Sequence, residues 1–310
     1  MERSTIIVSI LTLVSFLGVV FNWTVVIANR KIATAKHSFG ILTANQALGD
    51  ALYSTIFFFY FCPMIFFDSE FLMKYAGDAG FFLLVGYDLS TQSHFFISCN
   101  RFCAVFYPVK YSTIFSIRNS YLMTLVVNIV ALALSFGDYF VGCPLSWYRD
   151  LFLLNFPQTD FCAIVASHAN FSKYLIITSM VIVIDVATVF RVHQLRQRIN
   201  STTVPSDKES ASQRKREMSF LTQTCLQGAV FTVELITYFI LSPMMQNLWV
   251  IFFFTSFAWT SVHTLDGFIT LMFNQDMKKF VMKVISKRGH EDHPSSIENA
   301  TRSTSSSRTH

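Results

Sequence analysis

Of the ionisable residues within long apolar runs of the sequence, five are candidates for chemistry: Asp50, Asp88, Glu234, His263 and Asp266. A carboxyl or imidazole group in such surroundings is costly unless it binds a cation, relays a proton or hydrogen-bonds a ligand or a neighbouring helix. Each of the five therefore marks a candidate binding site. A satisfied hydrogen bond between two helices would explain each of them as well.

Sequence motifs of the common enzyme classes are absent. The chain has no GxxxxGK[ST] loop, no HExxH, no CxxC and no GxGxxG after a strand, and its eight His residues lack metal-ligand spacing. We therefore expect no enzyme activity, no cofactor and no metal cluster.

The composition indicates a membrane protein. Hydrophobic residues make up 52% of the 310 and charged residues only 14%, against about 25% charged in soluble domains. Seven apolar runs approach or exceed the ~20 residues of a spanning helix, and they do not alternate in polarity as barrel strands do. We expect an all-α membrane protein, a bundle of seven transmembrane helices at about 6–28, 41–67, 79–105, 121–141, 174–190, 219–241 and 248–273.

Lys and Arg residues alternate between the connections, which predicts the orientation. All but four lie in the segments 29–40, 101–120, 191–218 and 274–310, and the four exceptions are Arg3, Lys74, Arg149 and Lys173. The N-terminus is then outside and the C-terminus cytoplasmic, with the first helix as an uncleaved signal anchor. This bias accounts for the net charge of +5, so we expect no nucleic-acid partner.

Residues 1–288 are expected to form one domain that includes the seven helices and a cytoplasmic amphipathic helix at about 275–288. Lys278, Lys279 and Lys283 on this last helix could lie against anionic membrane lipid. The remaining segment, 289–310, is rich in Ser and Thr and is expected to be a disordered tail.

Three cysteines are expected at the outer ends of the helices, an oxidising environment. Cys62, Cys143 and Cys162 allow three single pairings, between which sequence does not choose. The pair Cys143–Cys162 closes a short loop and is our candidate disulfide. Among four Asn-x-Ser/Thr sequons only that of Asn170 is expected outside, as a candidate glycosylation site.

The run from Asn100 to Tyr111 reads NRFCAVFYPVKY. It resembles the rhodopsin-like receptor pattern Asp-Arg-Tyr-x-Ala-Val-x-x-Pro-Leu-x-Tyr, with Arg, Ala, Val, Pro and the final Tyr at the same spacing. The run from Asn45 to Asp50, NQALGD, is similar to the second-helix pattern Asn-Leu-Ala-x-Ala-Asp. These motifs resemble those of the rhodopsin-like G-protein-coupled receptors.

Other patterns of that superfamily are lost. The seventh helix lacks the Pro and Tyr of Asn-Pro-x-x-Tyr, and the sixth lacks Cys-Trp-x-Pro. Some superfamily motifs are therefore kept and others are lost. This combination, with the run FGILTANQA from Phe39 to Ala47, most resembles the nematode serpentine chemoreceptors of serpentine receptor class x.

The resemblance implies roles for residues at the cytoplasmic end of the third helix. Arg101, with Asn100, Phe102, Pro108 and Tyr111 around it, would restrain the inactive state and then face a heterotrimeric G protein. Asn100 replaces the acid that pairs with this Arg in the superfamily, which predicts a weaker restraint and raised basal activity. An Arg that only marks the membrane boundary is the alternative.

Two sites within the membrane are implied as well. Asp50, Ser90 and Asp266 would face one another, as a sodium pocket or as a neutral hydrogen-bonded pair. Glu234 is expected in the outer half of its helix, where it could meet a ligand amine or hydroxyl. Asp88 and His263 are the other candidate residues of a ligand pocket.

The sequence thus predicts a chemoreceptor that binds an external small molecule, odorant-like or pheromone-like, and signals through a G protein. The resemblance implies the plasma membrane of sensory cilia. The tail serines, such as Ser295 and Ser303, could be phosphorylated for an arrestin-type partner. A neuropeptide receptor of the same superfamily is one alternative, and a transporter or channel that uses the intramembrane carboxylates is another.

Overall fold

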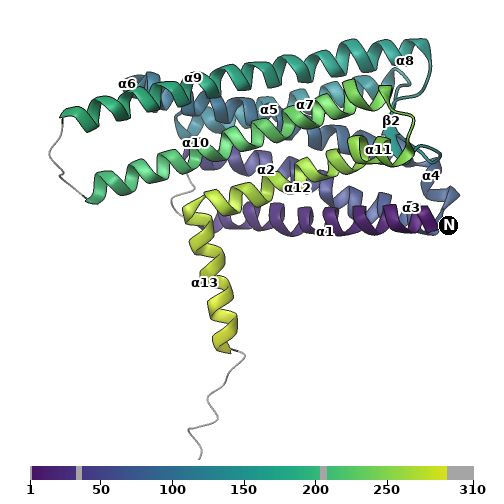
Figure 1. Ribbon diagram of the computed structural model, residues 1–310, viewed down its shortest axis with the longest axis horizontal. Coiled ribbons are helices and arrows are strands. Elements are labelled where there is room, and N and C mark those ends of the chain that lie inside the picture. Colours follow the sequence, from purple (N-terminus) through teal and green to yellow (C-terminus); the bar gives the residue numbers. More distant parts are fainter. Residues whose placement is uncertain (1, 33–36, 203–207, 292–310) are drawn as a thin grey trace, which may run out of the picture.

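The computed structural model describes residues 2–32, 37–202 and 208–291, and the long helices of this part lie side by side in one elongated bundle (Figure 1). In chain order they are α1 (Glu2–Lys31), α2 (Ser38–Ile56), α5 (Ala76–Phe106), α7 (Ile117–Phe140), α9 (Ser172–Thr202), α10 (Lys208–Leu235), α12 (Ala258–Phe273) and α13 (Gln275–Glu291). Shorter helices are α3 (Cys62–Phe67), α4 (Glu70–Lys74), α6 (Pro108–Ile114), α8 (Asp160–Ile164) and α11 (Leu248–Phe252). The N-terminus, α3, α4, α8 and α11 lie at one end of the bundle and α6 and α13 at the other.

Six helical segments of the described chain are long and apolar enough to cross a membrane. They are Arg3–Lys31, Ser38–Phe67, Ile117–Phe140, Asp160–Leu195, Met218–Met244 and Leu248–Phe273. Their outer faces carry exposed apolar side chains such as Phe59, Phe140 and Val183. Surfaces so apolar would aggregate in water but suit lipid.

Helix α5 is also long enough to span, yet it is not among these six segments because its sequence carries many polar residues. It packs against α2, α7, α9 and α10. Its buried polar residues are Asp88, Ser90, Thr91, Ser93, His94, Ser98 and Asn100. A helix enclosed by others can carry polar side chains where those neighbours hydrogen-bond them, so α5 forms the polar centre of the bundle.

Helices α2 and α5 approach each other closely at two glycines. A Cβ on Gly49 would lie 2.7 Å from the carbonyl oxygen of Gly86, and one on Gly86 would lie 2.9 Å from that of Gly49. Small residues of this kind let the backbones of membrane helices pack together.

Several helices widen into π-helix near the end of the bundle that holds α3 and α8. These stretches are η2 (Phe57–Phe61), η3 (Val165–Phe171), η4 (Ile236–Leu241) and η6 (Phe253–Phe257), with a 3₁₀ turn, η5 (Ser242–Met244), after η4. π-Helical turns often occur at functional sites, because they rotate the side chains that follow.

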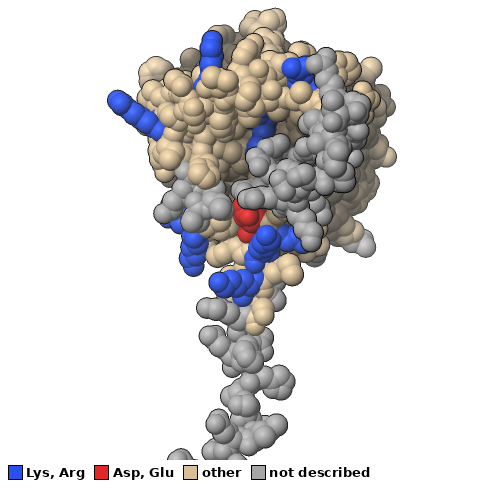
Figure 2. Space-filling model, turned by 90° about the vertical axis from the view of Figure 1, so that its left-hand side faces the viewer, with Lys and Arg blue, Asp and Glu red and all other residues tan. Residues whose placement is uncertain are grey.

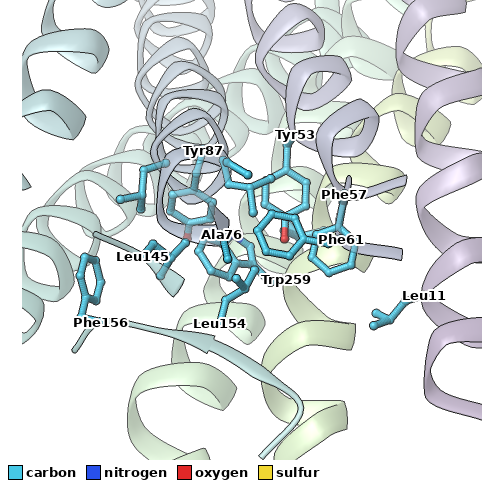
Figure 3. Packing of buried hydrophobic residues seen from close by; sticks show 14 of the residues in the cluster. Leu11, Tyr53, Phe57, Phe61, Ala76, Tyr87, Leu145, Leu154, Phe156 and Trp259 are labelled. Atoms are coloured by element: carbon cyan, nitrogen blue, oxygen red, sulfur yellow. The ribbon is translucent and has the colours of Figure 1, made fainter. Parts of the chain in front are cut away.

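The same end holds a two-stranded hairpin and the main apolar cluster. Strands β1 (Ser146–Tyr148) and β2 (Leu153–Asn155) pair antiparallel, with Trp147 opposite Leu154. Leu154 is fully buried, and it packs in one cluster with Tyr53, Tyr87 and Trp259 (Figure 3). The hairpin, which the sequence did not predict, therefore forms part of the core at this end.

At the opposite end α13 leaves the bundle and runs across its long axis (Figure 1). Met277 is buried against the bundle, whereas Lys278, Lys279 and Lys283 are exposed. Figure 2 looks onto this end and shows Lys and Arg side chains around its edge. The helix continues to Glu291, past the expected boundary at 288, and the tail serines lie outside the described residues.

The fifth helix is far longer than the expected 174–190. A continuous helical segment runs from Asp160 through η3 and α9 to Thr202. The polar residues Asn170, Ser172 and Lys173 made its first turns look like a loop in the sequence. They are helical because their side chains have partners within the bundle, as described below.

Candidate functional site

A narrow pocket opens between the helices at the hairpin end. Its empty space, including the part that is open to the surface, is about 300 Å³. Helices α5, α9, α10 and α12, the π-helical stretches η3 and η4 and the segment after β2 all contribute to it. The lining residues are Leu84, Tyr87, Phe156, Asn170, Tyr174, Glu234, Tyr238, Phe239 and Trp259.

Glu234 is the acidic residue of this lining. Only 3% of it is exposed, and its Oε2 accepts a hydrogen bond of 2.8 Å from the hydroxyl of Tyr87. The hydroxyl of Tyr238 donates instead to the carbonyl oxygen of Leu154, at 2.7 Å. The carboxyl group thus lies among aromatic rings and accepts one hydrogen bond from the described residues.

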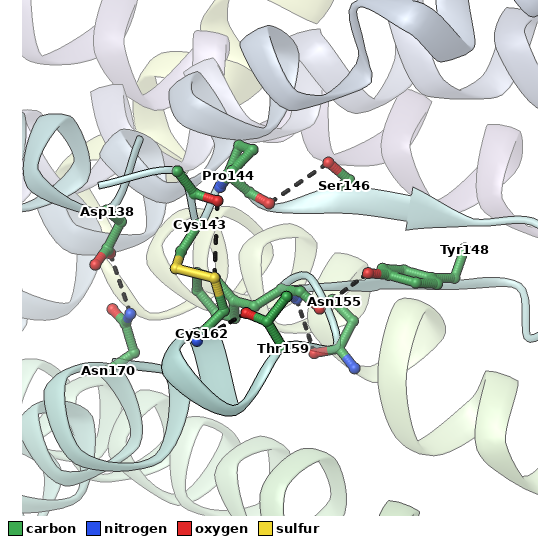
Figure 4. The surroundings of a disulfide bond; sticks show 11 residues. Asp138, Cys143, Pro144, Ser146, Tyr148, Asn155, Thr159, Cys162 and Asn170 are labelled. Carbon is green, nitrogen blue, oxygen red and sulfur yellow. Dashed lines mark hydrogen bonds between the residues drawn. A yellow bond between two sulfur atoms is a disulfide. The ribbon is translucent and has the colours of Figure 1, made fainter. Parts of the chain in front are cut away.

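The hairpin lies beside the pocket, where Tyr238 of the lining donates to Leu154 of β2, and a disulfide anchors the chain on either side of the hairpin. Cys143 and Cys162 are bonded to each other, the pairing favoured among the three (Figure 4). The bond ties the end of α7 to the start of α8. Because Cys62 is a buried free thiol in α3, its two alternative pairings are not formed.

Asp88 is not part of the pocket lining, contrary to our expectation. It is 1% exposed, and its Oδ1 lies 2.9 Å from the Nζ of Lys173. Lys173 also donates to the Oδ1 of Asn170 at 3.2 Å, and Asn170 donates to the Oδ2 of Asp138 at 3.1 Å. A buried ion pair and its hydrogen bonds therefore connect α5, α7 and α9 beside the pocket.

The same network corrects the glycosylation prediction. Asn170 is 2% exposed and both ends of its amide are hydrogen-bonded. A glycan on its Nδ2 would need space and exposure that this position does not offer.

His263 also lies outside the pocket lining, deeper in the bundle. Its Nδ1 is 2.7 Å from the Oδ1 of Asp50, and its ring stacks on Tyr53 with 3.9 Å between the centroids. Both groups of the pair are buried. The expected partner of Asp50 was Asp266, so the imidazole is an addition that the sequence did not predict.

Asp266 has a different hydrogen-bond partner from Asp50. Its Oδ2 accepts a hydrogen bond of 2.9 Å from Gln46, whereas its Oδ1 has no donor. Ser90 lies beside both carboxyl groups, although its hydroxyl makes no hydrogen bond of ordinary geometry. Asp50, Ser90 and Asp266 are therefore neighbours, as expected, and the site has more oxygen acceptors than donors.

This surplus of oxygens bears on whether a cation fits. Buried oxygens without a donor in the described residues include those of Asp266, Ser90, Gln46 and Asn22. Hydroxyl, amide and carboxylate oxygens are the ligands of hard cations. No three His, Cys, Asp or Glu groups of the described chain are placed for a transition metal. These acceptor oxygens therefore fit a monovalent cation or an ordered water molecule.

At the other end of α5, Asn100 joins three helices. Its Nδ2 donates to the Oγ of Ser38 at 2.8 Å, and its Oδ1 accepts from Tyr111 of α6 at 3.4 Å. Ser120 of α7 donates to the same Ser38 at 2.7 Å. Asn100 thus stabilises the contact between α5, α2 and α7.

Arg101 lies against two neighbouring aromatic rings. Its guanidinium carbon is 3.5 Å from the ring centroid of Phe39 on α2 and 4.5 Å from that of Phe220 on α10. The two rings are 4.7 Å apart and both are buried. We call Phe39, Arg101 and Phe220 the arginine clamp. Cation–π contacts of this kind are worth about 0.5–2 kcal/mol.

The other predicted residues of this end lie around the clamp. Phe102 stacks on Phe106 at 4.3 Å, and Pro108 begins α6. The sequence pointed to Arg101 but not to its contacts with Phe39 and Phe220, since it does not show which of the 34 Phe residues meet this guanidinium group.

Comparison with known proteins identifies the family. The family model of the serpentine-type 7TM GPCR chemoreceptor Srx matches residues 12–274. This chain belongs to the Srx family. It is 31% identical to "Serpentine receptor class X 45" of Caenorhabditis elegans over 280 aligned positions, which cover 85% of this chain and 77% of the relative. "Serpentine receptor class X-43" of the same organism is 27% identical over 273 positions, covering 84% and 81%.

Membership of the Srx family makes the chain a multi-pass, all-α membrane protein of the seven-helix receptor class, and not an enzyme. The six apolar segments and α5 together supply the seven long helices of that class. The predicted superfamily and subfamily are both confirmed.

Proposed function

We propose that this Srx-family chain binds an external small molecule in the pocket lined by Glu234 and activates a heterotrimeric G protein at the opposite end. The disulfide end would face outward, because disulfides persist in oxidising surroundings. The end with α13 would be cytoplasmic, in keeping with the Lys and Arg side chains around it (Figure 2).

The arginine clamp is the observation that carries the coupling proposal. Phe220 belongs to α10, so this helix covers Arg101 in the present conformation. Tyr107 and Val109 at the start of α6 are exposed beside it. A G protein would bind at this end when α10 moves away and exposes Arg101, which makes the clamp a restraint on the inactive state.

Helix α10 also reaches the pocket. Glu234 follows Phe220 by 14 residues, or about 21 Å and nearly four turns, so both face the bundle interior. A ligand that contacts Glu234 better in one position of α10 would shift the population toward that position. The enclosed space of the pocket is small and lined mainly by aromatic side chains, which favours a small molecule over a peptide.

We assign a sodium ion to the cluster of Asp50, Ser90 and Asp266. The surplus of acceptor oxygens in this cluster supports the assignment. The Asp266 carboxylate would supply the charge and Ser90 a neutral ligand. Such an ion would stabilise the resting arrangement of α2, α5 and α12.

The exposed lysines of α13 support a second membrane contact. Met282 and Val284 on this helix are exposed along with them. With its long axis across the bundle (Figure 1), α13 would lie on the inner leaflet and bind anionic lipid.

As a chemoreceptor of this family, the protein is assigned by this proposal to the plasma membrane of sensory cilia.

The test is G-protein activation in cultured cells by receptor with an N-terminal tag, beside Arg101→Ala. Arg118→Ala is the matched control, since Arg118 lies exposed at the start of α7. Staining of intact cells for the tag establishes orientation and equal surface levels. We expect activation by the parent and by Arg118→Ala, and its loss in Arg101→Ala. Equal activity of all three would refute the role of Arg101.

A further inference from the structure

We propose that the ligand of this receptor is a small amine, whose ammonium group pairs with Glu234 inside the ring of aromatic side chains. This rests on the proposed function only in taking the pocket as the ligand site. It does not require that the receptor couple to a G protein.

The first argument is the chemistry of the lining. Tyr87 packs edge-on against Tyr174 and Trp259, with centroids 4.5 and 5.4 Å apart, and Tyr238 lies 5.6 Å from Trp259. Aromatic faces around a single acid form the kind of cage that recognises ammonium groups. Glu234 would supply the full charge and the rings the remaining contacts.

The second argument is the balance of charge. Among the described residues no Lys, Arg or His forms an ion pair with Glu234. Lys173 is held 2.9 Å from Asp88, on the ring of Tyr174 and outside the lining. His263 is paired with Asp50. A positive charge that pairs with Glu234 would therefore arrive with the ligand.

The third argument is size. In this conformation the enclosed space that a water-sized group can reach is only about 20 Å³, close to the room that one water needs. This favours a compact ammonium group next to Glu234 over a bulky head group. A carboxylic acid would be repelled by Glu234, and an alcohol would leave the charge of the carboxylate uncompensated.

The experiment measures binding without a G protein. The thermal unfolding midpoint of purified full-length receptor in lipid nanodiscs is measured at increasing concentrations of each ligand. The ligands form three matched series: primary amines from ethylamine to 2-phenylethylamine, the corresponding alcohols, and the corresponding carboxylates. Any ligand that binds only the folded state raises the melting midpoint with its concentration. Alcohols partition into lipid more readily than ammonium ions, so a membrane effect would favour the alcohols.

Three variants accompany the parent. Glu234→Gln removes the charge, and Glu234→Asp keeps it while shortening the side chain. Asp185→Asn is the matched control, because it removes another buried carboxyl group, from α9 and outside the pocket lining. The midpoint of each variant without ligand establishes that it folds.

We expect one or more amines to bind at least tenfold more tightly than their alcohols and acids, with this preference lost in Glu234→Gln and kept in Glu234→Asp and Asp185→Asn. Amine binding that survives in Glu234→Gln, alcohols that bind as well as amines, or the failure of every amine to bind would overturn the proposal. Because G-protein activation is not measured, failure of coupling would leave this result unaffected.

Discussion

Each buried acid of this receptor meets a different partner. Asp88 has the ammonium group of Lys173, and Asp50 has the imidazole of His263. Among the described residues, Glu234 accepts a hydrogen bond only from the hydroxyl of Tyr87. Since an isolated buried charge costs more than a paired one, the first two acids are suited to hold the structure. The third is left for a ligand.

If a sodium ion binds at the proposed site, it should stabilise the folded receptor. We therefore expect a higher unfolding temperature in sodium chloride than in choline chloride of equal ionic strength. An ion at roughly five times its dissociation constant would add about 1 kcal/mol to the free energy of unfolding. The difference should disappear in Asp266→Asn and persist in Asp185→Asn. Identical midpoints of the parent protein in the two salts would assign ordered water to the site instead.

Residue types predicted which groups matter, but not how they pair. An acid in an apolar run is visible in the sequence, whereas its partner is chosen by the packing of distant helices. His263 and Asp50 are 213 residues apart, and Lys173 looked like part of an outer loop. For this reason Asp88 and His263, which we expected in the ligand pocket, lie outside the lining, whereas Glu234 is part of it; its role in binding a ligand stays a prediction.

Between the elements, α2 and α5 approach each other closely at Gly49 and Gly86. We expect Gly49→Ala to lower the free energy of unfolding by about 1–3 kcal/mol, because the new methyl group would meet backbone atoms of α5. Gly137→Ala is the matched control. Nothing lies within 4 Å of its Cβ position in α7, so it should be neutral or stabilise by about 0.5–1 kcal/mol.

Thermal melting of the two purified variants measures both effects. A Gly49→Ala receptor as stable as the parent protein would mean that α2 and α5 are not held this closely.

The disulfide joins the two ends of the segment that holds the hairpin. We expect Cys143→Ser, Cys162→Ser and the double variant to lose similar stability, about 2–5 kcal/mol, and to show reduced staining at the surface of intact cells. Cys62→Ser, at a buried free thiol, should retain the bond. Thiol labelling of the parent protein before and after reduction checks the pairing. A loss confined to Cys62→Ser would point to another disulfide.

Hydropathy predicted the helices well because lipid requires long apolar segments with internal hydrogen bonds. It failed at the start of the fifth helix, where the partners of Asn170 and Lys173 lie on other elements. The π-helical stretches and the hairpin also escaped prediction, since both depend on packing between helices rather than on local sequence.

Across the whole molecule, α10 and α12 connect the two ends. Below the pocket, Gln227 donates to the carbonyl oxygen of Asp266 at 3.3 Å, and Gln223 donates to the hydroxyl of Thr270 at 3.1 Å. Ser219 then donates to the carbonyl oxygen of Phe273 at 2.6 Å. These polar contacts are exchangeable, so α10 can change partners along α12 when it leaves the arginine clamp.

The central claim is that the clamp restrains a receptor that signals through Arg101. The most direct measurement is ligand-free G-protein activation by the parent, Phe220→Ala and the double variant Arg101→Ala/Phe220→Ala at equal surface level. Phe190→Ala, an exposed ring on α9, is the control.

Loss of a contact worth about 1–2 kcal/mol should raise the active fraction roughly five- to thirtyfold. We predict that rise in Phe220→Ala, its absence in Phe190→Ala, and a return to background in the double variant. Activity of Phe220→Ala equal to that of the parent with every Gα subunit tested, or a double variant as active as Phe220→Ala, would contradict the claim.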